Sequence, residues 1–154
     1  MFGEETALEN MRTDELLTML FMKSGLERLM EMDDGQELLP AFSDYITGLC
    51  RGNREPPERV IRRANIERSY GHQLFSGRRS PSRDTVLQLA FGFGMDYTGT
   101  QQLLKVARKS ALHPRVKRDM VLVYSLAHGL TLMDCQLLLQ KYRLPLLGEG
   151  NRNA

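Results

Sequence analysis

The chain has 154 residues, of which 42% are hydrophobic and 26% are charged, and its formal net charge is +2. This composition predicts one ordinary hydrophobic core with short appendages, and it is not the composition of a chain that is disordered as a whole. No apolar run approaches the roughly 20 residues that span a bilayer, and no basic region followed by an apolar segment opens the chain. We therefore expect a soluble, cytoplasmic protein without a membrane partner.

The charges are unevenly distributed along the chain. Residues 1–50 carry 3 basic and 11 acidic side chains, whereas residues 51–83 carry 9 basic and only 3 acidic ones. Residues 84–154 carry 9 basic and 5 acidic side chains. A local positive field favours a polyanionic partner, although an arginine-rich stretch is more often simply a solvated surface.

Cysteine and histidine give no sign of a metal site. Cys50 and Cys135 lie far apart without a CxxC partner, which predicts neither a zinc site nor a disulfide framework. His72, His113 and His128 have no Cys, Asp or Glu at ligand spacing, and no Ser or Cys stands in a nucleophile elbow. We therefore expect no metal, no cofactor and no enzymatic activity.

The acidic N-terminal segment, residues 1–41, is predicted to hold two short helices. The first runs from Thr13 to about Lys23 and the second from Leu26 to Met32, with a break at residues 33–36. Four methionines of these helices would give an adaptable partner surface, but a core-filling role is favoured for them: Met19, Met22, Met30 and Met32.

The next two predicted helices lie on either side of a polar connector. Ser43 or Asp44 caps a helix of roughly residues 44–50. Pro56 and Pro57 are tolerated only in a first turn, so they begin another helix, with Val60, Ile61 and Ala64 inward and its end near Asn65.

A further short helix follows after a tight turn. It covers residues 67–75, has Leu74 and Tyr70 inward, and is stopped by Gly77. The arginine-rich loop of residues 78–83 comes next. Two short helices joined by a tight turn and closed by a basic loop form a layout typical of proteins that read DNA.

Two longer helices complete the predicted domain. Ser82 caps a helix that ends near Gly94, and another runs from Asp96 to about Ser110. Residues 42–110 are thus predicted to form a five-helix domain, and the fold class is all-α.

The C-terminal part repeats the end of this domain, because residues 83–108 recur 35 positions later as residues 118–143. The correspondence includes charged, apolar and helix-ending positions: Arg83 and Asp84 match Arg118 and Asp119, Gly94 matches Gly129, Asp96 stands where Thr131 stands, and Gln101 matches Gln136.

Each copy therefore predicts a helix hairpin. The second hairpin occupies residues 111–147, begins its first helix at Pro114 and ends its second at Pro145. A single hairpin cannot bury both of its faces, so we expect the second copy to stack on the first and to extend a small helical array. Residues 148–154 read as a flexible polar tail.

Residues 56–94 resemble the phage-repressor, or Xre-type, helix-turn-helix family. The best-matched run is FSGRRSPSRDTVLQLAFGFG, residues 75–94, which is similar to the family's end of the recognition helix, basic pair and packing helix. The resemblance implies a phage-repressor-like five-helix fold and a bacterial, sequence-specific transcriptional regulator. It also implies double-stranded DNA as partner, a location on the nucleoid when bound, and a homodimer that reads two half-sites.

The resemblance also assigns roles to residues by position. It places the helix of residues 67–75 in the major groove, with these side chains near base edges: Arg68, Ser69, Tyr70, His72 and Gln73. Arginine and glutamine suit this task because they bind guanine and adenine in bidentate fashion. Three arginines would bind phosphate: Arg78, Arg79 and Arg83.

A rival interpretation is a helical protein-interaction adaptor that keeps this fold without reading DNA. Pro57 stands where family members often use a polar residue to contact the DNA backbone, and proline has no amide hydrogen to donate. Gly71 stands where an inward apolar side chain is usual. Either Tyr70 compensates by filling the gap at Gly71, or DNA reading has been relaxed in favour of protein binding. In this interpretation the C-terminal hairpins bind a protein or peptide partner, whereas the basic loop and polar helix favour DNA.

Overall fold

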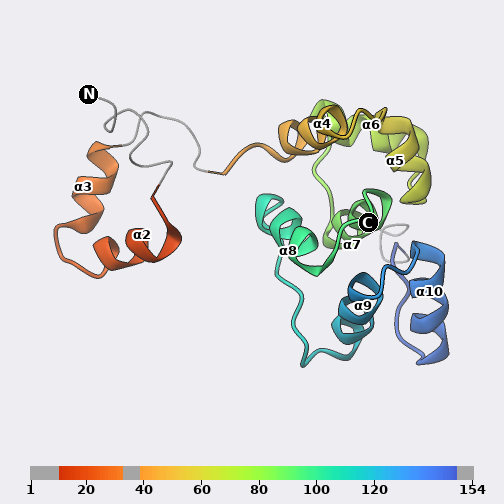
Figure 1. Cartoon of the computed structure of the whole chain (residues 1–154). Helices are drawn as coiled ribbons and strands as arrows, with labels where there is room; N and C mark the ends of the chain where they lie inside the picture. The colour runs from red at the N-terminus through yellow and green to blue at the C-terminus, as the bar shows by residue number, and fades with distance from the viewer. Residues whose placement is uncertain (1–10, 33–38, 149–154) are drawn as a thin grey trace. The chain divides into compact units, whose positions relative to one another are not determined.

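The computed structural model describes residues 11–32 and 39–148 (Figure 1). The chain divides into two units, Met1–Pro40 and Ala41–Ala154. All regular secondary structure in the described ranges is helical, which confirms the all-α class there. None of the helices in these ranges has the length and apolar character needed to cross a membrane. The predicted break at residues 33–36 and the predicted tail beyond Gly148 lie outside the described residues.

The N-terminal unit contains two short helices, α2 (Thr13–Leu20) and α3 (Gly25–Glu31). The first ends three residues before the predicted Lys23, because the chain turns at Phe21. In the described part of this unit, only Gly25 and Leu29 are buried in the two helices. The prediction that the methionines fill a core is wrong within this unit for three of them, because Met22, Met30 and Met32 are exposed. A pair of short helices offers little surface against which they could be buried.

The second unit contains the remaining helices of the described chain. They are α4 (Phe42–Gly52), α5 (Pro57–Arg63), α6 (Arg68–Ser76), α7 (Arg83–Gly92), α8 (Tyr97–Val106), α9 (Lys117–Ala127) and α10 (Leu132–Lys141). The predicted start of α9 at Pro114 is wrong. Pro114 lies in a turn closed by a hydrogen bond from the amide of Val116 to the carbonyl oxygen of His113, and the helix begins only after this turn.

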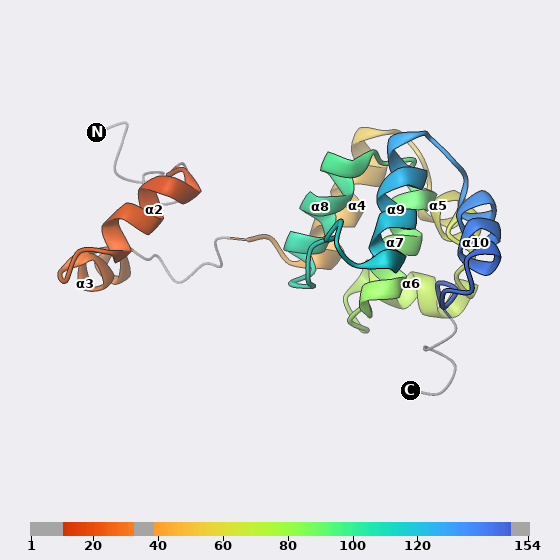
Figure 2. The same ribbon diagram turned by 90° about the horizontal axis from the view of Figure 1, so that it is seen from below.

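Helix α7 is the centre of this unit. Each of its residues from Thr85 to Gly92 is buried, and it packs against α5, α8 and α10 (Figure 2). A helix that is surrounded on all sides needs apolar residues around most of its circumference, and VLQLAFG supplies them apart from Gln88, whose side chain is hydrogen-bonded. Leu87 and Leu89 are completely buried, and burial stabilises the fold by about 1.5–3 kcal/mol for each such side chain.

Helices α5 and α6 approach each other closely at Gly71. A Cβ atom added to this glycine would lie 2.6 Å from Cγ2 of Ile61, so no larger residue fits without movement. The expectation that Tyr70 fills the gap left by Gly71 is wrong, because the side chain of Ile61 already occupies it. Gly71 therefore permits close helix packing at this position.

The repeat seen in the sequence is also present in the backbone. Gly94 follows α7 and Gly129 follows α9, with φ angles of 68° and 65°. The equivalent residues Arg108 and Arg143 both have a φ of 57°. The caps correspond as well, since the side chain of Asp96 accepts a hydrogen bond from the amide of Gly99 and that of Thr131 from Asp134. Helices α7–α8 and α9–α10 are thus two copies of one hairpin.

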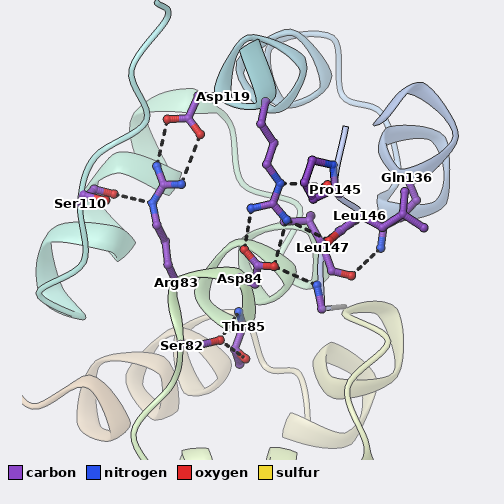
Figure 3. A network of polar contacts seen from close by, with 12 residues as sticks. Ser82, Arg83, Asp84, Thr85, Ser110, Asp119, Gln136, Pro145, Leu146 and Leu147 are labelled. Carbon is purple, nitrogen blue, oxygen red and sulfur yellow. Dashed lines mark hydrogen bonds and ion pairs between the residues drawn. The ribbon is translucent and has the colours of Figure 1, made fainter. Parts of the chain in front are cut away.

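The two copies exchange equivalent ion pairs, as Figure 3 shows. Arg83 of the first copy donates to both carboxylate oxygens of Asp119, at 3.2 and 3.0 Å. Arg118 of the second copy donates to both carboxylate oxygens of Asp84, at 2.9 Å each. Each arginine therefore pairs with the aspartate of the other copy.

The same arginines also bind the chain segment that follows their own hairpin. Arg83 donates to the carbonyl oxygens of Ser110 and Ala111, and Arg118 donates to those of Pro145 and Leu146, 35 positions later. Gln101 and Gln136 repeat the pattern, because their side-chain amides each make two hydrogen bonds to the backbone, of Leu112 and Leu147 respectively. These bonds hold each following segment against its own hairpin, whereas the exchanged ion pairs join the C-terminal hairpin to α7.

Candidate nucleic-acid interface

Helix α6 presents a polar outer face and an apolar inner one. Gly71 and Leu74 are buried, whereas Arg68 and Ser69 are exposed and His72 and Gln73 are half-buried. Glu67 caps the helix, since its carboxylate accepts hydrogen bonds from the amides of Ser69 and Tyr70, at 2.8 Å each. These bonds lower the pKa of Glu67, that from Tyr70 having the larger effect.

Four of the five predicted base-reading side chains share this outer region, and Tyr70 differs from them. Tyr70 is half-buried, packs against the core and lines a pocket with residues of α7 and the C-terminal segment. The other four lie on the part of α6 that faces away from Leu74: Arg68, Ser69, His72 and Gln73.

An acidic residue, Glu58 of α5, lies beside this polar face. Its Oε1 accepts a hydrogen bond from Arg68 at 2.8 Å and lies 3.6 Å from Nε2 of His72. The hydrogen bond from Arg68 holds the pKa of Glu58 below its ordinary value. The side chain of Arg68 is nevertheless 79% exposed, so a ligand has access to it.

The loop after α6 presents two arginines to solvent. Gly77 ends the helix with a φ of 84°, and the amide of Arg79 returns to the carbonyl oxygen of Gln73 at 3.2 Å. Arg78 and Arg79 are both exposed, and no residue in the ranges 11–32 and 39–148 forms an ion pair with them. Their guanidinium groups are therefore accessible next to the polar face of α6.

Arg83, the third predicted phosphate ligand, is engaged within the protein. Its guanidinium donates to Asp119, Ser110 and Ala111, and its side chain is only 25% exposed. The structure therefore assigns Arg83 to the contact between the two hairpins, and we remove it from the candidate phosphate ligands. The sequence contained a signal of this role, because the repeat places an equivalent arginine at residue 118.

Glu58 is a residue of this surface that sequence reasoning missed. Glu58 is separated from Arg68 by ten positions and by a turn, so no helical spacing rule connects them. Ile61 was identified as inward-facing, but only the close approach of α5 and α6 explains why Gly71 stands opposite it.

The cysteines and acidic residues give no alternative site within the described residues. No group of three or more His, Cys, Asp or Glu side chains there has metal-binding geometry. Cys50 and Cys135 are buried free thiols, and burial is the main cause that raises the pKa of each. Comparison of the chain with protein-family models, curated proteins and solved structures finds no match.

Proposed function

We propose that residues 41–148 form a helix-turn-helix DNA-binding unit of the phage-repressor type that acts as a transcriptional regulator. Helix α6 would lie in the major groove, with Arg68, His72 and Gln73 near base edges. The observation that carries the proposal is that the exposed arginines 78 and 79 directly follow the polar helix α6.

The dimensions and chemistry of α6 support this assignment. An α-helix with its side chains is about 10–12 Å across, and the major groove is about 12 Å wide, so a helix such as α6 can enter it. Arg68 and Gln73 carry the side chains that bind guanine and adenine most specifically, whereas arginines 78 and 79 would bind phosphate without regard to sequence. A short recognition helix covers few base pairs, so we propose that a homodimer reads two half-sites.

The salt dependence of DNA binding tests the proposal. We would recover double-stranded DNA by selection from a random pool and measure its affinity by fluorescence anisotropy at about 50 and 200 mM salt. Combining Arg78→Ala with Arg79→Ala should weaken binding of all sequences and reduce the slope of log K against log salt by about 2 units. Lys105→Ala, an exposed change on α8, is the control and should leave both quantities unchanged.

Base reading requires a different pair of changes. Arg68→Ala with Gln73→Ala should remove sequence preference, at about 1–3 kcal/mol for each lost bidentate contact, while non-specific affinity falls less. Absence of DNA binding, or binding that does not depend on salt, would contradict the proposal.

A second candidate function, a protein-interaction adaptor, is favoured by one surface. Met120 and Tyr124 lie one turn apart on α9, Val116 directly precedes this helix, and each of the three is about half exposed. Their counterparts in the first copy are buried, and these are Pro81, Thr85 and Leu89. The second hairpin thus exposes an apolar face, whereas the equivalent face of the first hairpin is buried.

Selection of peptides from a random display library tests this alternative. Peptides recovered by the wild-type chain but not by a Met120→Ser, Tyr124→Ser variant would support an adaptor function. If the same variant binds DNA as the wild type does and no peptide distinguishes the two, the adaptor candidate fails.

A further inference from the structure

A pocket of about 460 Å³ lies where the turn between α5 and α6, helix α7 and the C-terminal segment meet. Residues 65–67 form its wall on the α5–α6 side, Gln88 belongs to α7, and Leu146, Leu147 and Gly148 close it from the C-terminal side. This volume is typical of sites for small molecules. The elements around it are held together by hydrogen bonds from Gln136 to Leu147 and from Gly148 to Asp84.

Gln88 supplies a buried acceptor to this pocket. The residue is only 6% exposed, and its amide nitrogen donates to the carbonyl oxygens of Ala64 and Asn65. Its Oε1 accepts no hydrogen bond from any residue that the structure describes. This oxygen is also not fully enclosed by protein. The Oε1 atom is therefore open to the pocket, where it can accept a hydrogen bond from a ligand.

Among the described residues that line the pocket, only Glu67 carries a formal charge. Each of its carboxylate oxygens accepts one backbone hydrogen bond and retains capacity for a second. The half-buried ring of Tyr70 lies on the same side, and Ile66, Leu146 and Leu147 contribute apolar surface. A carboxylate, an open amide oxygen and an aromatic ring together favour a ligand that is a cation and a hydrogen-bond donor.

We propose that this pocket is a binding site for a small organic cation, namely a molecule with an ammonium or guanidinium group attached to a short apolar part. The cationic group donates to Glu67 and to Oε1 of Gln88. The apolar part lies against Leu146, Leu147 and Ile66. Such a ligand would connect the α5–α6 turn to the C-terminal hairpin, which the proposed DNA contacts do not require.

Isobutylammonium, with neutral isobutanol as the matched probe, tests the site by NMR titration of the full 15N-labelled chain. Saturable shifts should be confined to amides around the pocket, such as those of Asn65, Tyr70 and Gly148. Isobutylammonium should bind about tenfold more tightly than isobutanol, because only the cation makes charge-assisted hydrogen bonds. The titration contains no DNA, so its result is independent of the proposed DNA-binding function.

Three variants sharpen the experiment. Glu67→Gln should weaken isobutylammonium binding about tenfold, whereas Asp44→Asn, which removes an exposed charge on α4, should leave it unchanged. Since Glu67 also caps α6, Leu146→Trp provides a second test by filling the pocket from its half-buried rim, and both probes should then lose binding. Equal responses to the two probes, shifts spread over the whole surface, or binding that survives Leu146→Trp would overturn the proposal.

Discussion

Arg118 donates from both terminal guanidinium nitrogens to the two carboxylate oxygens of Asp84, each at 2.9 Å, across 34 residues of sequence. The equivalent Arg83 does the same to Asp119 in the opposite direction. The aspartate side chains are 17% and 4% exposed, so both pairs are largely shielded from solvent. Planar bidentate pairs of this kind fix orientation as well as contact.

Removing one carboxylate should destabilise the fold strongly. Asp119→Asn leaves the guanidinium of Arg83 partly buried without its counter-charge and weakens the hydrogen bond from the amide of His113. We expect the free energy of unfolding to fall by about 3 kcal/mol, measured by urea denaturation with circular dichroism at neutral pH. Asp44→Asn, an exposed change, should stay within about 0.5 kcal/mol of wild type, and a similar value for Asp119→Asn would contradict the role assigned to this pair.

The pair between Arg118 and Asp84 should make stability depend on acid pH. Burial alone raises the pKa of Asp84, but the hydrogen bonds from Arg118 and from the amide of Gly148 outweigh it, so that the pKa lies below its ordinary value. The stability that this pair contributes is therefore fully present above a pH of about 3.9, which is the pKa of an unfolded aspartate. It is lost as the pH falls through the lower pKa of Asp84 in the folded protein. The difference in unfolding free energy between wild type and Asp84→Asn should shrink between pH 7 and pH 3. A difference that stays constant over this range would exclude the linkage.

Replacement by alanine should have opposite effects on stability at two helical glycines, Gly71 of α6 and Gly48 of α4. Gly71→Ala places a Cβ atom 2.6 Å from Ile61, and we expect a loss of about 1–3 kcal/mol from overpacking. Gly48→Ala meets nothing within 4 Å inside α4 and should stabilise the protein by about 0.5–1 kcal/mol. Both values come from denaturant unfolding. In the Ile61→Ala background the cost of Gly71→Ala should disappear, and a cost that persists there would show that Ile61 is not its cause.

Glu58 should limit DNA binding if α6 reads DNA. Its carboxylate pairs with Arg68 and lies near His72, so it competes with DNA for both side chains. Glu58→Gln should therefore strengthen DNA binding roughly two- to fivefold at low salt, in line with the usual strength of an exposed ion pair. The measurement is the same anisotropy titration, with Glu27→Gln on α3 as a charge-matched control. Weaker binding by Glu58→Gln would show that the carboxylate supports the interface and does not compete with it.

Several helix ends were predictable from the sequence because their start and stop signals are local, but the predicted cap of α4 by Ser43 or Asp44 is wrong, since this helix begins at Phe42 without a side-chain cap. Ser82, Asp96 and Thr131 cap helices as expected, and Gly77 ends α6. The start of α9 was predicted wrongly from Pro114, because proline suits a helix start and a turn equally well. Local signals do not distinguish these two uses.

The roles of charged residues were harder to predict, because they depend on contacts between distant segments. Arg83 lies next to arginines 78 and 79 in sequence, yet its partner Asp119 is 36 positions away. The pairing of Glu58 with Arg68 depends on how α5 and α6 turn against each other. The DNA-reading roles assigned to Arg68, Ser69, His72 and Gln73 stay predictions, and so does the role of Tyr70.

The exchange of ion pairs between the hairpins also decides how far such a repeat can extend. In a solenoid each unit presents one surface to the unit before it and a different one to the unit after it, so growth has no fixed end. Here each hairpin gives its arginine and its aspartate to the same neighbour, as the subunits of a two-fold dimer do. The arginine and the aspartate of each hairpin are then already paired, so neither is available to a third copy. The hairpin pair is thus a closed unit of two.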